Sequence, residues 1–218
     1  MMHKSPVSWK AVHQGRWMAK CMVAVCAAML LAACGGNART AEPAHYDLGN
    51  PGAAAAGWTV APAIIEVQAA AWLTGPAMHY RPAYAEPLRR QAYAGSRWAA
   101  SPAELLEGAL RRRAAAAEAT AQGAGCRLQL ALDEFEQRFD DPRSSQSSIE
   151  VRAQLLPLQG GDSLARRAFR VARPAPTPDA GGGAMAARDA VQGLGDDLGR
   201  WLADLARERP GMLAHCRN

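Results

Sequence analysis

The residue with the clearest chemical context in this sequence is Cys34, which directly follows an apolar run near the amino terminus. The run extends over Cys21–Ala33, which is shorter than the roughly 20 residues that an α-helix needs to cross a bilayer. The residues before it include basic side chains and no acidic one: Lys4, Lys10, Arg16 and Lys20. A positive segment followed by a short apolar core and small residues is typical of a secretory signal peptide. The sequence therefore predicts that residues 1–33 direct export and are removed.

The end of this run, Leu31-Ala32-Ala33-Cys34, resembles the lipobox of bacterial lipoproteins. The resemblance implies that the Cys34 thiol receives a diacylglycerol, that cleavage occurs just before it, and that the new amine is acylated. Two or more acyl chains hold a protein firmly at a membrane, whereas one chain holds it only marginally. On this interpretation residues 34–45 form the lipidated amino terminus and a tether. The alternative is an ordinary signal peptide followed by a chance cysteine.

The net charge of +5 does not indicate a nucleic-acid partner, because the excess lies in the predicted signal peptide. Every lysine of the sequence lies before Cys34, together with Arg16, whereas none of the 20 acidic residues does. The mature chain is therefore close to neutral. Met1, Met2 and Met18 could each be the translation start, and the mature protein is the same in all three cases.

Two further cysteines, Cys126 and Cys216, remain in the mature chain. Because an exported protein folds in an oxidising compartment, we predict a disulfide between them. Closing a loop of about 90 residues could stabilise the fold by ~4–5 kcal/mol in the chain-entropy description. The alternative is two unpaired, partly buried thiols.

The strongest helix signal is Ser101-Pro102-Ala103-Glu104, in which serine can cap the first turn and glutamate can reach back to the cap. We predict a helix from here to about Ala121. A second helix is predicted by apolar spacing from Val191 to Leu205, despite three glycines whose unfavourable helix propensity tertiary packing must offset.

Strands are predicted by alternation of apolar and polar residues. The clearest three follow one another as a meander at Arg127–Asp133, Ile149–Leu155 and Phe169–Val171, with a bulge where Phe135 breaks the phase. Earlier in the chain we expect a buried strand from Ile64 to Trp72 and a hairpin formed by 78–81 and 88–93. Pro174–Gly183 is predicted to be a loop. The order is strands, a helix, a three-strand antiparallel meander and a C-terminal helix, so a mixed β-sheet covered by helices in an α/β fold is the expected arrangement.

Catalytic and metal-binding patterns are scarce. The mature histidines are far apart in the sequence, the serines sit in a predicted turn, and the carboxylates near them are expected to keep an exposed hairpin soluble. These residues are His45, His79 and His215; Ser144, Ser145, Ser147 and Ser148; and Asp133, Glu134, Asp140 and Asp141. Gly181-Gly182-Gly183 lacks the Lys-Ser/Thr of a phosphate loop, and Arg111–Arg113 is expected to be a solvated helix face. We predict no catalytic residue, metal or cofactor.

Several segments together resemble the ABC-type transport auxiliary lipoproteins, the lipoprotein partners of MCE-domain lipid transporters that include the paraquat-inducible system. The segments read HYDLG at the mature start, AWLTGPAMHYRPAYAEPLRRQAYAGSRWAASPAELLEGALRRR in the middle, and LQLALDEFEQRFDDPRSSQSSIEVRAQL in the hairpin. With the closing helix, the resemblance covers about residues 46–206. It implies a single periplasmic, three-layer α/β domain over residues 46–218, anchored to the outer membrane, and Gly35 after Cys34 agrees with that membrane.

The resemblance implies a non-enzymatic adaptor that works with an MCE-domain protein and an ABC permease and ATPase to move phospholipids or related apolar molecules. An alternative is a lipid- or solute-binding lipoprotein that carries cargo itself and would need an apolar pocket. A third hypothesis is an envelope hydrolase that uses Ser144 or Ser145. The candidate interface residues are large amphipathic rings, each of which could equally pack inside the fold: Trp72, Tyr80, Tyr84 and Trp98.

Overall fold

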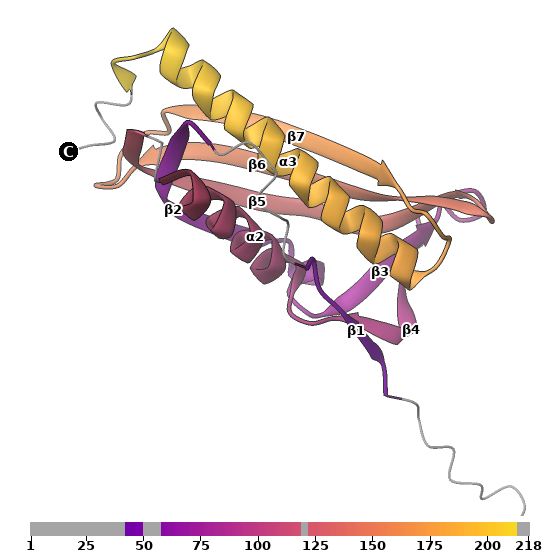
Figure 1. Ribbon diagram of the computed structural model, residues 1–218. Helices are drawn as coiled ribbons and strands as arrows, with labels where there is room; N and C mark the ends of the chain where they lie inside the picture. Colours follow the sequence, from indigo (N-terminus) through magenta and orange to yellow (C-terminus); the bar gives the residue numbers. More distant parts are fainter. Residues whose placement is uncertain (1–41, 50–57, 119–121, 213–218) are drawn as a thin grey trace, which may run out of the picture. The chain divides into compact units, whose positions relative to one another are not determined.

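The fold is organised around one long strand, β5 (Gln122–Asp141), shown with its neighbours in Figure 1. The computed structural model describes residues 42–49, 58–118 and 122–212, which belong to a compact unit beginning at Glu42. The other elements are β1 (Ala44–Tyr46), β2 (Val60–Ala69), the short 3₁₀ helix η2 (Ala71–Leu73), β3 (Ala77–Pro82), β4 (Gln91–Trp98), α2 (Pro102–Glu118), β6 (Ser144–Pro157), β7 (Ala165–Pro174) and α3 (Ala180–Glu208). No helix among these residues is long and apolar enough to cross a membrane.

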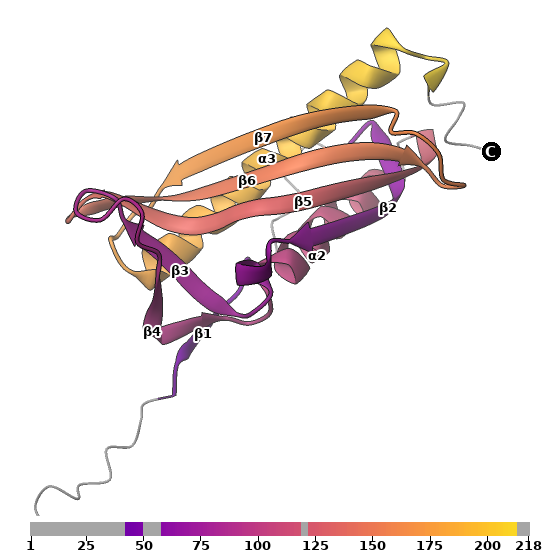
Figure 2. The ribbon, with the colours of Figure 1, turned by 180° about the vertical axis from the view of Figure 1, so that it is seen from behind.

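Strand β5 has a single neighbour on one edge and two neighbours on the other, as Figure 2 shows. Strand β6 pairs with it antiparallel along nearly its whole length, and β7 continues the meander. On the other edge, β2 runs parallel to the first half of β5, from Val60 opposite Gln122 to Ala69 opposite Leu132. Strand β3 runs parallel to the last part, with Pro82 opposite Phe139. Strands β4 and β1 extend the sheet beyond β3, which gives a mixed seven-stranded sheet.

Both helices cover the same face of this sheet, as the two opposite views show (Figures 1 and 2). The residues under them alternate along the strands, as the sequence predicts: Leu128, Leu130 and Leu132 of β5 are buried, as are Ile149, Val151 and Leu155 of β6. The other face carries cross-strand ion pairs, including Asp133 with Arg152 and Glu150 with Arg170. The α/β class, the mixed sheet and the order of elements are confirmed. The helices form one layer on the sheet rather than the two that a three-layer domain would need, because a face of charged pairs does not attract an apolar helix.

The predicted bulge near Phe135 is confirmed by a shift in the β5–β6 register between Leu132 and Glu134. Leu132 and Phe135 are both buried, although they lie three residues apart. The extra residue therefore restores the inward face of β5 and turns two successive acidic side chains, Asp133 and Glu134, toward the charged face.

Helix α2 begins as the sequence predicts. The Ser101 hydroxyl and backbone N–H both donate to Glu104 Oε2, at 2.7 and 2.9 Å, and Pro102 is the first helical residue. The acid lies next to the helix amino terminus, and these hydrogen bonds lower the pKa of Glu104. The described part of the helix ends at Glu118, so the predicted end at Ala121 lies outside the described residues.

Gln137, a buried glutamine in β5, joins three other elements. Its side-chain oxygen accepts a hydrogen bond from the Tyr93 hydroxyl of β4 at 2.9 Å. Its side-chain nitrogen donates to Ser145 Oγ of β6 at 2.7 Å and to the Asp179 carbonyl at the start of α3 at 3.1 Å. Burial raises the pKa of the Tyr93 hydroxyl, so this group stays protonated as a donor. The hairpin, the meander and the helix start thus share one polar junction.

The loop predicted at Pro174–Gly183 is wrong in its last part, because α3 already begins at Ala180. Asp179 caps the helix by accepting a hydrogen bond from the Gly182 N–H at 2.7 Å. Two of the glycines that indicated a loop, Gly182 and Gly183, are required by close packing instead. A Cβ atom on Gly183 would lie 2.1 Å from Gln137 Oε1, so only glycine lets the first turn approach the polar junction.

Glycines later in α3 have a similar reason. Trp58 is buried against the helix, and its indole N–H donates to the Gly195 carbonyl at 2.9 Å. A Cβ atom on Gly199 would lie 2.5 Å from Trp58 Cδ1, and one on Gly193 would lie 2.4 Å from an Arg173 nitrogen. Tertiary packing therefore compensates for the low helix propensity of these glycines.

Substituting Gly199→Ala should destabilise the protein by about 1–3 kcal/mol, because the added methyl group overlaps the buried Trp58 ring. Gly108→Ala in α2 is the matched control. Its Cβ atom would meet only Arg112 Nη1 at 3.4 Å, so the gain in helix propensity, up to ~1 kcal/mol, should stabilise the protein. Urea unfolding of the two variants checks the opposite signs; a Gly199→Ala protein as stable as the parent would contradict the packing argument.

Candidate interaction surface

The serines considered as nucleophiles lie on strand β6, which begins at the exposed residue Ser144. Ser145 and Ser147 are buried under α3. The Ser145 hydroxyl accepts a hydrogen bond from Gln137, and the Ser147 hydroxyl donates to the Gly183 carbonyl at 2.7 Å. Ser144 donates to Asp141 at the tip of the hairpin. These hydroxyls therefore serve structural hydrogen bonds, and none of the hydrogen bonds of the described residues joins a serine to a histidine.

The candidate carboxylates are engaged in local pairs. Arg152 binds Asp133 through two hydrogen bonds of 2.7 Å, and this guanidinium lowers the pKa of the acid. Contact with the Ser144 hydroxyl lowers the pKa of Asp141. Within the described ranges no group of three or more His, Cys, Asp or Glu side chains is placed to hold a metal ion.

The structure describes two of the three histidines, and they lie on different strands. His79 of β3 packs edge-on against Trp72, and burial lowers the pKa of its imidazole. His45 lies on the exposed strand β1, and His215 lies outside the described residues.

The predicted solvated face at Arg111–Arg113 holds only in part. Arg112 is exposed, but Arg113 crosses to α3, where it contacts Asp196 and its side chain is 10% exposed. Arg111 donates to the Ile65 carbonyl of β2 at 3.3 Å, and Glu107 accepts from the Val67 N–H at 2.9 Å. Two side chains of α2 thus bind backbone groups of β2, because backbone groups without a partner on that strand would otherwise stay unsatisfied.

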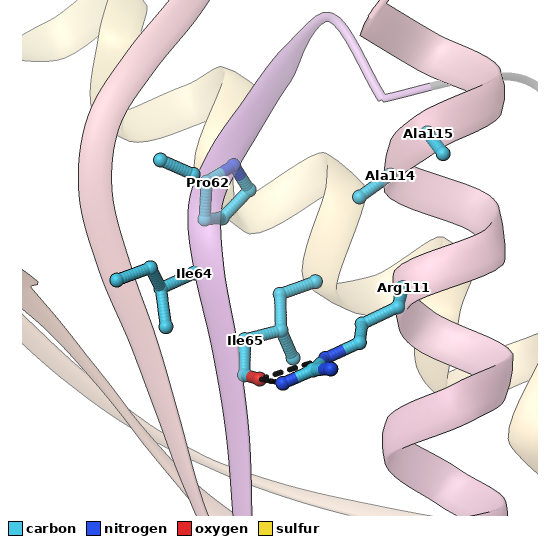
Figure 3. Close-up of a pocket in the computed structure, with 7 residues that line it drawn as sticks. Pro62, Ile64, Ile65, Arg111, Ala114 and Ala115 are labelled. Atoms are coloured by element: carbon cyan, nitrogen blue, oxygen red, sulfur yellow. Dashed lines mark hydrogen bonds between the residues drawn. The ribbon is translucent and has the colours of Figure 1, made fainter.

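A pocket of about 350 Å³ adjoins this contact between β2 and α2 (Figure 3). Its walls are mostly small or apolar residues, including Pro62, Ile65, Ala114 and Ala115. The Arg111 guanidinium, bonded to the Ile65 carbonyl, lies at one side, as Figure 3 shows. The volume is at the lower end of the range for small-molecule sites.

The four aromatic candidates for an interface differ sharply in exposure. Trp98 is 4% exposed and packs against Phe135, with ring centroids 5.4 Å apart. Tyr80 is partly buried and donates to Gln91 at 2.6 Å. Trp72 is covered by the Arg90 guanidinium, which lies 3.4 Å from its ring centroid. Tyr84, in the turn between β3 and β4, is 52% exposed and is the one of the four at the surface.

The β3–β4 turn is held rigidly while it presents apolar side chains. Leu88 is 94% exposed there, beside Tyr84. The backbone N–H of Tyr84 donates to the Phe139 carbonyl at 3.3 Å, and Arg81 Nη1 donates to the Pro87 carbonyl at 3.1 Å. A fixed apolar tip of this kind is suited to contact with a partner.

A charged cluster at the base of the hairpin positions this turn. Arg81 binds Glu136 at 2.6 Å, and Arg90 binds both Glu134 and Glu136, at 2.8 and 3.0 Å. The Glu136 side chain is only 6% exposed. Burial raises the pKa of Glu134, and the nearby Glu136 carboxylate raises it further, while Arg90 and Arg81 lower it. We did not identify this cluster from the sequence, because it depends on the long-range pairing of β3 with β5.

The structure describes one of the three cysteines that the sequence singles out. Cys126 is fully buried in β5, opposite Pro157 of β6, whereas Cys34 and Cys216 lie outside the described residues. Strand β1 begins at Ala44, so the first strand overlaps the end of the predicted tether. At the other end, Met212 packs against the core.

The family comparison matches residues 46–199 to a family described as ABC-type transport auxiliary lipoprotein component. The chain belongs to this family. The ABC-transport auxiliary lipoproteins were the family expected from the sequence, so that prediction is confirmed. As a member, the chain is a membrane-anchored periplasmic lipoprotein auxiliary to ABC-type transport. The comparison with curated proteins finds no match.

Two solved structures share the fold of this auxiliary lipoprotein. A crystal structure of a Xanthomonas campestris protein of family DUF330 is similar at a TM-score of 0.61 and 23% identity, over 78% of this chain and 97% of that one. A crystal structure of an uncharacterized protein is similar at a TM-score of 0.58 and 12% identity, over 74% of this chain and 99% of that one. At these identities the likeness concerns the fold alone.

Substituting Glu136→Gln should lower the free energy of unfolding by about 2 kcal/mol, because Arg81 and Arg90 lose a buried charged acceptor. Glu150→Gln on the same face is the matched control. Its partner Arg170 is 74% exposed, so the loss should stay below about 1 kcal/mol. Chemical denaturation compares the two variants, and equal losses would show that the cluster does not hold the hairpin.

Proposed function

We propose that this protein is an outer-membrane-anchored periplasmic lipoprotein and a non-enzymatic adaptor subunit of an MCE-type ABC transport system. The observation that carries the proposal is the family match over residues 46–199, which lies directly downstream of a lipobox-like sequence ending at Cys34. In this proposal residues 1–33 are removed, Cys34 carries the lipid, residues 34–45 form the tether and residues 46–218 form the periplasmic domain. Gly35 supports the outer membrane as the destination.

The proposed partners are an MCE-domain protein and the permease and ATPase of the complex, with phospholipids or related apolar molecules as cargo. A non-enzymatic role is supported by the structural hydrogen bonds of Ser145 and Ser147. The rigid β3–β4 turn, with Tyr84 and Leu88 exposed, is the proposed contact with the complex.

The second candidate function is a carrier that binds the cargo itself, and the pocket beside Ile65 and Arg111 is the observation that favours it. The adaptor is better supported, because the guanidinium at the pocket is already bonded to the β2 backbone and the space between helices and sheet is filled by a continuous apolar core.

The anchor is tested by labelling cells with radioactive palmitate. The parent protein and a Cys26→Ala control, altered within the apolar run, should incorporate label, whereas Cys34→Ala should not. In a deletion strain the parent and the control should restore resistance to detergents and Cys34→Ala should not. Label on Cys34→Ala, or full restoration by it, would contradict the proposed anchor.

The purified parent protein also distinguishes the adaptor hypothesis from the carrier hypothesis. Solvent extraction of the purified parent protein should release no phospholipid in a fixed ratio to protein. The acyl chains that mass spectrometry detects should all be covalently attached. Non-covalently bound phospholipid in a fixed ratio to protein would favour the carrier instead.

The proposed Cys126–Cys216 disulfide is supported by the position of Cys126 in the core and by Met212, which brings the chain against the core shortly before Cys216. Mass spectrometry of the non-reduced protein should find a peptide pair linked through these cysteines. Reduction should lower the free energy of unfolding by up to ~4–5 kcal/mol. Recovery of both cysteines as free thiols from periplasmic protein would contradict the bridge.

A further inference from the structure

Strand β7 lies at one end of the strand order of the sheet, and β1 lies at the other end. Strand β7 pairs with β6 along Ala165–Pro174, and no other described strand pairs with it. Figure 1 shows β7 at one side of the sheet and β1 at the opposite side. Because each residue of an antiparallel strand directs its N–H and C=O groups to one side, half of the β7 backbone groups face away from β6.

The charge on this edge is not neutralised. Strand β7 contains four arginines and no acidic residue, and among the described residues only Arg170 has a carboxylate partner, Glu150. The side chains of Arg166 and Arg167 form no hydrogen bond with the described residues; the Arg167 guanidinium lies 5.3 Å from the centroid of the Phe169 ring, and the Arg173 side chain donates to the Ala172 carbonyl. Most arginines on the other strands do have a carboxylate within ion-pair distance, namely Arg81, Arg127, Arg138 and Arg152.

These arginines lie on both sides of the free edge. Phe169 and Val171 are buried under α3 or just beside it, which places Arg167 and Arg173 on the helix-covered side. Arg166 and Arg170 therefore lie on the other side, separated by the small residue Ala168. A strand added along this edge would therefore place its side chains next to guanidinium groups on both faces of the sheet.

We propose that β7 binds an extended, acidic segment of a partner protein, which adds to the sheet as a further strand. Backbone hydrogen bonds to the edge would supply affinity, and pairing of acidic side chains with Arg166, Arg167 and Arg173 would supply specificity. A protein is favoured over a membrane as the occupant, because the described chain begins next to β1, at the opposite edge of the sheet, and the proposed anchor precedes β1 in the sequence. This last step rests on the proposed function.

The arginines could instead only protect the edge from aggregation, as charged residues on edge strands often do. The two roles differ in whether an acidic strand binds. The probe is a short fluorescein-labelled peptide in which glutamate and valine alternate, titrated with the full mature chain in detergent and followed by fluorescence anisotropy. Control peptides replace glutamate with lysine or place proline at the centre.

We expect saturable binding of the acidic peptide that weakens with salt and that the lysine and proline peptides do not show. The double variant Arg166→Glu/Arg167→Glu should bind at least tenfold more weakly. Arg112→Glu, which alters an exposed arginine of α2 that has no carboxylate partner in the described part of the chain, should bind within twofold of the parent. Circular dichroism confirms that the variants are folded.

Three outcomes would overturn the inference: no saturable binding to the parent, equal binding by the double variant, or equal binding of the proline peptide. Stronger β7-dependent binding to phosphatidylglycerol vesicles than to the peptide would assign the edge to a membrane instead. The assay requires neither acylation nor the transport complex. A negative peptide result would therefore contradict the β7 proposal without affecting the test of the lipid anchor. A negative palmitate result would contradict the anchor without affecting the peptide result.

Discussion

The amide of Gln137 is the interaction on which the rest of this structure depends. It lies in the middle of the protein, where β4, β6 and the start of α3 meet β5, and each of its three hydrogen bonds goes to a different element. A buried amide needs hydrogen-bond partners for its oxygen and its nitrogen. In the folded protein its three partners must therefore all lie within hydrogen-bond distance: the Tyr93 hydroxyl, the Ser145 hydroxyl and the Asp179 carbonyl. Gly183 follows from the same requirement, because any side chain there would displace the amide. Loss of the Tyr93 hydroxyl, for example, would remove the hydrogen bond to the buried Gln137 Oε1.

The bulge in β5 determines which of its side chains lie on the inner face with Gln137 and which lie on the outer face. The register shift after Leu132 keeps Phe135 and Gln137 on the inner face and directs Glu134 and Glu136 to the outer face. There the two carboxylates bind Arg81 of β3 and Arg90, which directly precedes β4, so the hairpin is held to β5 from both faces. The exposed turn at its end is rigid because its base is held twice, by the inner amide and by the outer ion pairs.

Local patterns were sufficient for elements whose cause is local. The capping box at Ser101 and the alternation of the meander depend on residues a few positions apart. The start of α3 could not be predicted, because its glycines indicate a loop unless their close approach to Gln137 and Trp58 is known. The charged cluster was missed for the same reason, since the parallel pairing of β3 with β5 joins distant segments. The aromatic candidates were chosen by type, and only their burial separates Tyr84 from the rings that pack inside.

The two edges of the sheet differ. At one edge lies the short strand β1, and the neighbouring β3–β4 hairpin carries the exposed side chains Tyr84 and Leu88 in its turn. At the other edge β7 carries three arginines that have no carboxylate partner among the described residues, and its outer backbone groups pair with no described strand. For the proposed adaptor this separation matters more than the pocket beside Ile65, because two partners that bound at these places would not compete for one site.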